Sequence, residues 1–182
     1  WTPAPDGVVV ESAAGSEKFD RAVITAGAWA NGLLNLPTAD VKPWPRTLFW
    51  RRPQTDGFAL GRFSCFAVEE DDGRFFYGFP AIDADGVKVA EHSGGAAIAR
   101  PEDRGDAAEP GESEAIDAFL GARIPALAGQ PGKFQRCLYE VSADHHFLID
   151  RHPLSDRVVF AAGLSGHGFK FSPVLGEALA AM

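Results

Sequence analysis

The feature that most constrains the fold lies near the C-terminus, where a β-branched run, a glycine loop and an apolar helix follow one another. A buried strand is predicted over Val158–Ala162, the loop after it contains Gly163, Gly166 and Gly168, and a helix is expected to begin near residues 169–172. Glycine lets the backbone take a positive φ and approach a ligand closely, and a helix start offers free N–H groups. This succession predicts a site for a negatively polarised group such as a phosphate or a carboxylate. The alternative is a plain strand-to-helix turn whose glycines only relieve crowding.

The composition argues against several classes of protein. The chain has 182 residues, 46% of them hydrophobic and 23% charged, as is ordinary for a globular protein of one or two domains. Its net charge is −8 and no stretch is rich in lysine and arginine, so we expect neither nucleic acid nor an anionic membrane as a partner. No apolar stretch is long enough for a membrane span. Cys65 and Cys137 are too few for a disulfide framework, which indicates a reducing, cytoplasmic setting, and Cys65 is assigned to the core.

Periodicity divides the chain into three regions. Residues 1–40 and 136–182 have the pattern of one α/β layer, whereas residues 41–135 have the alternation of an antiparallel sheet with one buried face. We therefore expect a mixed α/β and α+β fold in which a β-rich domain is inserted into an α/β domain. A cleft between two such layers is a common ligand site. Strands are predicted at residues 7–12, 21–25, 47–52, 65–69, 74–79, 87–91, 137–141, 147–150 and 158–162, and helices at 29–34, 113–123 and after 168.

Local patterns make three of these predictions more specific. The strands at 7–12 and 21–25 are expected to pair, because only a short polar stretch separates them. The helix at 113–123 has an apolar face and is expected to bury it. That face consists of Ile116, Phe119 and Leu120. A separate segment that crosses between the layers is expected around Pro37, Pro43 and Pro45.

Four segments, taken together, resemble one known family. They are FDRAVITAGAWANGLL, RFFYGFPAIDADGVKVAEH, KFQRCLYEVSADHHFLIDRHP and VVFAAGLSGHGFKFSPVLGEAL. In this order they are similar to the C-terminal half of the monomeric sarcosine oxidase family of FAD-dependent amine oxidases, which includes N-methyltryptophan oxidase and pipecolate oxidase. The resemblance implies a D-amino-acid-oxidase-like fold, in which an FAD-binding α/β layer carries an inserted antiparallel substrate domain.

The resemblance implies FAD as the cofactor and assigns residues to it. Cys137 matches the cysteine that forms a thioether to the flavin, a bond that needs a thiolate, which nearby cations favour. From the residues alone, the favoured interpretation of Cys137 is a small buried hydrophobic group. The other residues matched to the cofactor are Gly166, His167, Gly168 and Lys170 in the glycine loop, and Gly27, Ala28 and Trp29 in an earlier turn.

The resemblance also implies catalytic and substrate-binding roles. Lys88 matches a lysine that activates dioxygen through its charge, and Lys170 matches a lysine that pairs with the substrate carboxylate. Tyr77 and His92 match residues that line the substrate pocket, and His92 is expected to share one strand face with Lys88. Ala67 implies a wider pocket than the one that accepts sarcosine. The alternatives are surface lysines and core aromatic residues.

The expected activity is oxidation of an N-methyl or cyclic secondary amino acid to an imine, with reduction of O₂ to H₂O₂. The family's N-terminal GxGxxG motif is not in the sequence and the chain opens on a strand at Trp1, so we expect a C-terminal portion that is inactive alone. A cofactor-free fragment and a flavin dehydrogenase of the same fold are the alternatives. The pair His145 and His146 suggests a metal, but the sequence offers no third ligand.

Overall fold

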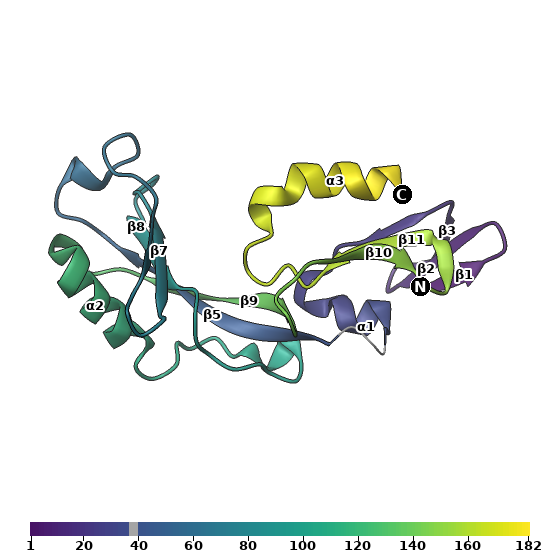
Figure 1. Ribbon diagram of the computed structural model, residues 1–182, viewed down its shortest axis with the longest axis horizontal. Helices are drawn as coiled ribbons and strands as arrows, with labels where there is room; N and C mark the ends of the chain where they lie inside the picture. Colours follow the sequence, from purple (N-terminus) through teal and green to yellow (C-terminus); the bar gives the residue numbers. More distant parts are fainter. Residues whose placement is uncertain (37–39) are drawn as a thin grey trace. The chain divides into compact units, whose positions relative to one another are not determined.

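The computed structural model describes residues 1–36 and 40–182, and the contacts among them separate two units (Figure 1). The first, called here the α/β unit, consists of Trp1–Trp44 and Tyr139–Met182, and the second, the β unit, consists of Pro45–Leu138. The chain passes from one unit to the other within the strands β5 (Val41–Arg51) and β9 (Phe134–Ser142).

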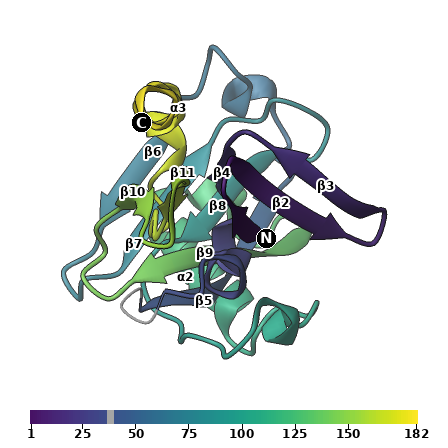
Figure 2. The ribbon, with the colours of Figure 1, turned by 90° about the vertical axis from the view of Figure 1, so that its right-hand side faces the viewer.

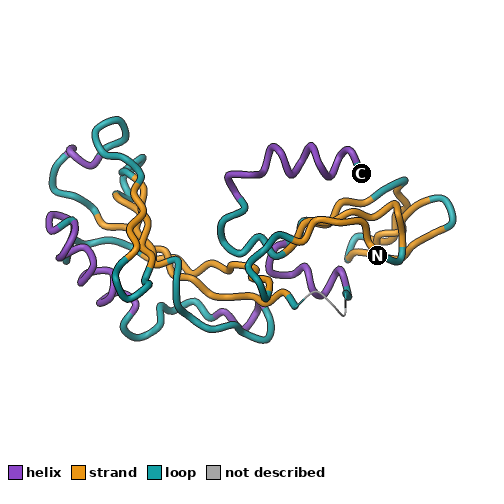
Figure 3. Tube along the Cα trace, viewed as in Figure 1, coloured by secondary structure: helices purple, strands orange, loops and turns teal. Residues whose placement is uncertain are grey.

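The α/β unit is built on a sheet with the strand order β10-β11-β4, in which β11 pairs parallel to β4 and antiparallel to β10. Alternate residues of a strand face opposite sides. Val158 and Phe160 of β11 therefore pack toward α1, whereas Val159 and Ala161 pack on Leu179 of α3, which lies along β11 (Figure 3). Helices thus cover both faces. The elements are β4 (Ala22–Ile24), β10 (Leu148–His152), β11 (Ser155–Ala162), α1 (Ala30–Leu34) and α3 (Ser172–Ala181).

A separate antiparallel sheet begins the chain, formed by β1 (Thr2–Ala4), β2 (Gly7–Ser12) and β3 (Gly15–Phe19) (Figure 2). The predicted pairing of 7–12 with 21–25 was wrong, because β2 pairs with β3 and β4 lies beside β11. Every residue of β3 is exposed, so its polar composition concealed a strand. Gly15, at φ 128°, allows the tight turn before it.

The β unit contains a sheet with the strand order β6-β7-β8-β5-β9. The helix α2 (Glu112–Arg123) covers one face, and its predicted bounds and buried residues are confirmed to within one residue. Phe119 stacks on Phe76 of β7 at 4.2 Å between ring centroids, and Val87 and Val89 of β8 complete this core. The remaining elements are β6 (Phe66–Glu69), β7 (Phe75–Phe79), β8 (Val87–Glu91) and the 3₁₀ turns Gly27–Trp29, Asp56–Phe58, Pro101–Arg104, Pro125–Leu127 and Phe169–Phe171.

The predicted crossing segment includes Pro43 and Pro45, and the chain passes from one unit to the other there, at Trp44–Pro45. Both prolines lie within β5, and Pro37 lies outside the described residues. Proline lacks a backbone donor, and β8 pairs with β5 only at Leu48–Arg51, beyond both prolines. Cys65, which was assigned to the core, is exposed, because the next residue along the chain takes the core position at the start of β6.

Candidate functional site

Tyr77, Lys88 and His92 lie on the face of the β unit's sheet that α2 does not cover, called here the open face. The neighbours of Lys88 in β8 are Val87 and Val89, which are fully buried in the core beneath α2. Since successive side chains of a strand alternate, Lys88 points to the open face. The register places Tyr77 opposite the residue two positions after Lys88, on the same face. The expectation that Lys88 and His92 share a face agrees with the position of His92 beside Tyr77, with 6.5 Å between their ring centroids.

Aromatic rings surround the ammonium group of Lys88. Its Nζ lies 5.3 Å from the ring centroid of Phe79 and 5.9 Å from that of Trp50, and these two residues are its cross-strand neighbours on β7 and β5. Both distances are within the range of cation–π attraction. The side chain is half-buried, so the charge is fixed over the sheet and only partly hydrated.

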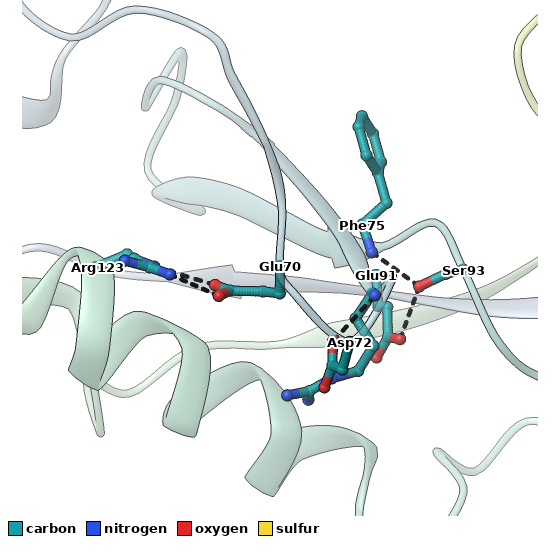
Figure 4. A network of polar contacts seen from close by, with 7 residues as sticks. Glu70, Asp72, Phe75, Glu91, Ser93 and Arg123 are labelled. Atoms are coloured by element: carbon teal, nitrogen blue, oxygen red, sulfur yellow. Dashed lines mark hydrogen bonds and ion pairs between the residues drawn. The ribbon is translucent and has the colours of Figure 1, made fainter.

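The end of β8 is tied to the start of β7, which fixes the backbone at His92. Its N–H donates to the carbonyl of Phe75 at 2.7 Å, and its ring lies 5.8 Å from the Phe75 ring. Ser93 Oγ accepts the N–H of Phe75 and donates to the Glu91 carboxylate, both at 2.9 Å (Figure 4). These bonds hold the backbone at His92 near Tyr77.

Cys137 is half-buried in β9 and lies in a positively charged environment. Burial raises the pKa of the Cys137 thiol above its usual value, and the positive charge of Lys88, followed by those of Arg46, Arg104 and Arg136, acts in the opposite direction. The cations expected around this thiol are therefore present, but desolvation outweighs them. Lys88 is the charge that most favours the reactive thiolate.

Two hollows in the β unit lie beside the start of α2, and the smaller one is lined by Glu91 and Ser93, on either side of His92. Their volumes are about 190 and about 390 Å³, and none of Tyr77, Lys88 and His92 is among the described residues that line them. The larger is lined by the buried Arg136, which pairs with Glu109 at 3.2 Å and Glu112 at 3.4 Å. We assign this charged cluster to anchoring the start of α2, not to the candidate site.

In the α/β unit, the predicted glycine loop follows β11 and has a left-handed backbone at Gly163, Ser165 and Gly166, with φ of 65°, 51° and 76°. A Cβ on Gly166 would lie 2.4 Å from the Tyr139 ring. At Gly168, where φ is ordinary, a Cβ would lie 2.6 Å from the side chain of Leu164. Conformation and packing therefore require these glycines.

The two cationic side chains predicted for this loop differ in their surroundings. His167 is half-buried, its ring lies 4.9 Å from that of Phe147, and its Nε2 is 3.3 Å from the carbonyl of His145. Lys170 is exposed at the start of the last helical segment, with Nζ 5.4 Å from the ring centroid of Phe171. Lys170 is thus accessible to an anionic group.

The turn Gly27–Trp29 and the glycine loop lie at the same edge of the sheet. They follow β4 and β11, which are adjacent and parallel with Val159 opposite Val23, so both follow the carboxyl ends of their strands. Gly27 has φ 53°, and no described atom lies within 4 Å of a Cβ built on it. Ligands of open α/β sheets bind outside the carboxyl ends of the strands, so this edge suits a cofactor.

Sequence analysis missed Glu140 of β9. This residue is 7% exposed, and its Oε1 has no hydrogen-bond partner among the described residues. Burial raises the pKa of Glu140 to about 7, although hydrogen bonds from the backbone N–H groups of Gly163 and Leu164 act to lower it. The signal available in the sequence was an acidic residue inside the strand CLYEVS.

Two features are absent from residues 1–36 and 40–182. No helix there is long and apolar enough to cross a membrane. No group of three histidine, cysteine, aspartate or glutamate side chains there could hold a metal ion.

Comparison with known proteins identifies relatives of this chain. The chain is 36% identical over 173 residues to N-methyl-L-tryptophan oxidase of Salmonella dublin, covering 94% of this chain and 45% of that protein. It is 35% identical over 181 residues to monomeric sarcosine oxidase of Bacillus sp. (strain B-0618), covering 97% and 46%. The chain thus spans just under half the length of these curated relatives.

Solved structures and a family profile complete the comparison. Amadoriase I from Aspergillus fumigatus, a fructosyl amine:oxygen oxidoreductase, superimposes with a TM-score of 0.76 at 23% identity, covering 98% of this chain and 43% of that one. This likeness confirms the expected fold class. The profile of the family described as FAD dependent oxidoreductase (DAO) matches residues 3–182. The chain belongs to this family of FAD-dependent oxidoreductases.

Proposed function

We propose that the protein containing this chain is an oxidase that uses FAD to convert N-methyl or cyclic secondary amino acids to imines and reduces O₂ to H₂O₂. The observation that carries the proposal is the Lys88 ammonium held over the rings of Phe79 and Trp50, on the open face that also carries Tyr77 and His92. The names of the relatives support an amine substrate. Both cysteines are free among the described residues, which supports a reducing, cytoplasmic setting.

The residues present fit FAD. Cys137 would hold it through a thioether, and the backbone at the sheet edge, with open space beside Gly27 and a left-handed loop at Gly166, would let a cofactor approach closely. His167 and Gly168 in the same loop, and Ala28 and Trp29 in the turn, would line it. When bound, FAD supplies the acceptor for the two electrons of the amine.

The protein's own side chains bind substrate and set charge. Lys170 would pair with the substrate carboxylate, since a desolvated carboxylate needs a charged donor. Tyr77 and His92 would shape the amine pocket on the open face. The Lys88 ammonium, held over aromatic rings, would favour electron transfer to dioxygen by stabilising the negative charge that forms there. No acid–base residue of this chain is needed if the substrate amine reacts as the neutral form.

Flavin attachment is tested by the variant Cys137→Ser. We expect the unmodified protein to retain its yellow colour in an acid precipitate and to carry the mass of one FAD, because the cofactor is covalently bound. In Cys137→Ser the colour should pass entirely into the supernatant, since a serine hydroxyl cannot replace the thiolate. Intact-mass spectrometry and the visible absorbance of both fractions measure this.

The matched control is Cys65→Ser, because Cys65 is the other cysteine and is exposed. We expect Cys65→Ser to keep its flavin in the precipitate. Colour in the supernatant of the unmodified protein would contradict covalent attachment. If only Cys65→Ser lost its colour to the supernatant, the flavin would be attached to Cys65 and the assignment to Cys137 would be wrong.

Pocket width is tested at Ala67. This residue is exposed on β6 directly opposite Tyr77, so a larger side chain there would narrow the space beside Tyr77. We expect Ala67→Phe to lower kcat/KM for N-methyltryptophan by roughly tenfold or more relative to that for sarcosine. Steady-state kinetics with both substrates measure the ratio, with sarcosine as the internal control. An unchanged ratio of the two kcat/KM values would show that Ala67 does not line the substrate pocket.

A further inference from the structure

Four side chains form a row across the open face of the β unit at the level of Lys88. Phe79 of β7, Lys88 of β8 and Trp50 of β5 are direct cross-strand partners, so their side chains lie on the same face. The N–H of Trp50 donates to the carbonyl of Lys133 at 2.8 Å, which places Lys133 next to Trp50 on the side away from β8. Aromatic and cationic residues thus alternate along the row, and both ammonium groups approach the ring of Trp50.

The two lysines of the row differ in what else holds their charge. Lys133 Nζ lies 5.0 Å from the centroid of the Trp50 ring, and it also pairs with the Asp85 carboxylate at 2.5 Å. Lys88 Nζ has no carboxylate at ion-pair distance in the part of the chain that the structure describes, and its contacts are with the rings of Trp50 and Phe79. A lysine side chain has a flexible four-carbon stem, so these rings are what restricts Lys88 to one position.

Trp50 is better placed than Phe79 to hold the ammonium group. The Phe79 ring is slightly nearer, but tryptophan attracts a cation most strongly of the aromatic side chains, and Trp50 is half-buried whereas Phe79 is 42% exposed. The Trp50 backbone is also fixed from both sides, because it pairs with β8 and bonds to Lys133. A Cβ on Gly132 would lie 1.7 Å from the Trp50 carbonyl oxygen, so the close approach on this side requires glycine.

We propose that Trp50 is a positioning residue for Lys88: its ring holds the ammonium group at one place over the open face, and it affects the reaction only through that lysine. The consequence for oxygen rests on the proposed function, in which the Lys88 charge favours electron transfer to dioxygen. The contact between the ring and Nζ does not rest on it, because both residues belong to the β unit.

The contact is tested by nuclear magnetic resonance of the FAD-loaded protein, with lysine labelled with ¹³C at the ε-carbon. An aromatic ring shields protons above it, so we expect the Lys88 ε-methylene signal upfield of that of Lys42, whose side chain is 57% exposed. In Trp50→Leu the Lys88 signal should move downfield, toward that of Lys42. In Trp50→Phe, which keeps a ring, it should move much less, and Lys133→Met should leave it in place.

The role is tested by stopped-flow reoxidation, with rates compared per bound flavin. We expect Trp50→Leu to lower the rate of reoxidation by dioxygen by roughly three- to tenfold, the rate equivalent of one cation–π contact. In a Lys88→Met background the same substitution should change the rate no further, because the group that Trp50 positions is gone. Trp50→Phe should recover most of the rate. Reduction by the amine should be the same in every Trp50 variant, which would show that the fold is retained.

The outcomes separate this proposal from the proposed function. A Lys88 signal that does not move in Trp50→Leu would overturn the positioning role. An unchanged reoxidation rate in that variant, or an equal loss with and without Lys88, would overturn it too. Unaltered reoxidation in Lys88→Met would instead contradict the oxygen role of Lys88, and the Lys88 signal in Trp50→Leu would still show whether the ring positions the lysine.

Discussion

In the FAD-loaded protein, Lys88→Met is expected to slow reoxidation by dioxygen by roughly 10²- to 10³-fold, the usual effect of removing one preorganised charge or donor from a site. Reduction by the amine substrate should change only slightly. Stopped-flow absorbance measures the two half-reactions separately. The variant would therefore convert an oxidase into a dehydrogenase.

The geometry explains why the effect should be large and specific. Lys88 is half-buried between the rings of Phe79 and Trp50, so its charge acts through a medium less polarisable than water. Methionine is unbranched and flexible and can fill the same space, so the variant removes the charge with little change in packing. Because Lys88 also favours the thiolate of Cys137, the flavin content of the variant must be measured first, and rates compared per bound flavin.

A matched control comes from the same aromatic ring. Lys133 Nζ lies 5.0 Å from the ring centroid of Trp50, but its side chain is nearly half exposed and forms an ion pair with Asp85. Lys133→Met should leave reoxidation unchanged. Unaltered oxygen reactivity in Lys88→Met, or an equal loss in Lys133→Met, would show that the role assigned to Lys88 is wrong.

The elements that could be predicted from the sequence are those whose pattern is set by burial on one face. β8 runs from Val87 to Glu91 as expected, and α2 buries its predicted apolar face, because alternation and helical periodicity are local signals. β3 escaped prediction because both its faces are exposed, which leaves no apolar alternation. The partner of β4 could not be predicted either, because its parallel pairing with β11 joins segments at opposite ends of the chain.

The same distinction applies to the candidate site. A period of two suffices to place Lys88 and His92 on one face, and the family resemblance identified Cys137 as a candidate. The dominance of burial over positive charge at the Cys137 thiol arises only in the folded chain, where β9 lies beside β5 at the edge of the sheet. Glu140 was missed for a related reason, because its burial and its contacts with Gly163 and Leu164 arise only when β9 and the loop meet.

Glu140→Gln is expected to change how stability depends on pH. The pKa of Glu140 rises from 4.5 to about 7 on folding, mainly because burial disfavours the charged form. Below about pH 4.5 the carboxyl is protonated in both states and does not affect the free energy of unfolding. Between the two pKa values the unfolded state ionises first, so the folded state loses stability as the pH rises. Above about pH 7 the loss is complete at about 3 kcal/mol.

Glutamine cannot ionise, so the variant should not show this loss. Urea unfolding at several pH values between about 4 and about 9 gives the free energy of unfolding of both proteins. The difference between Glu140→Gln and the unmodified protein should grow in favour of the variant by up to about 3 kcal/mol across this range. Glu177→Gln, which removes an exposed carboxyl, should show no such growth. A constant difference for Glu140→Gln would mean that the carboxyl ionises at the same pH in the folded protein as in the unfolded chain, and that burial does not raise its pKa.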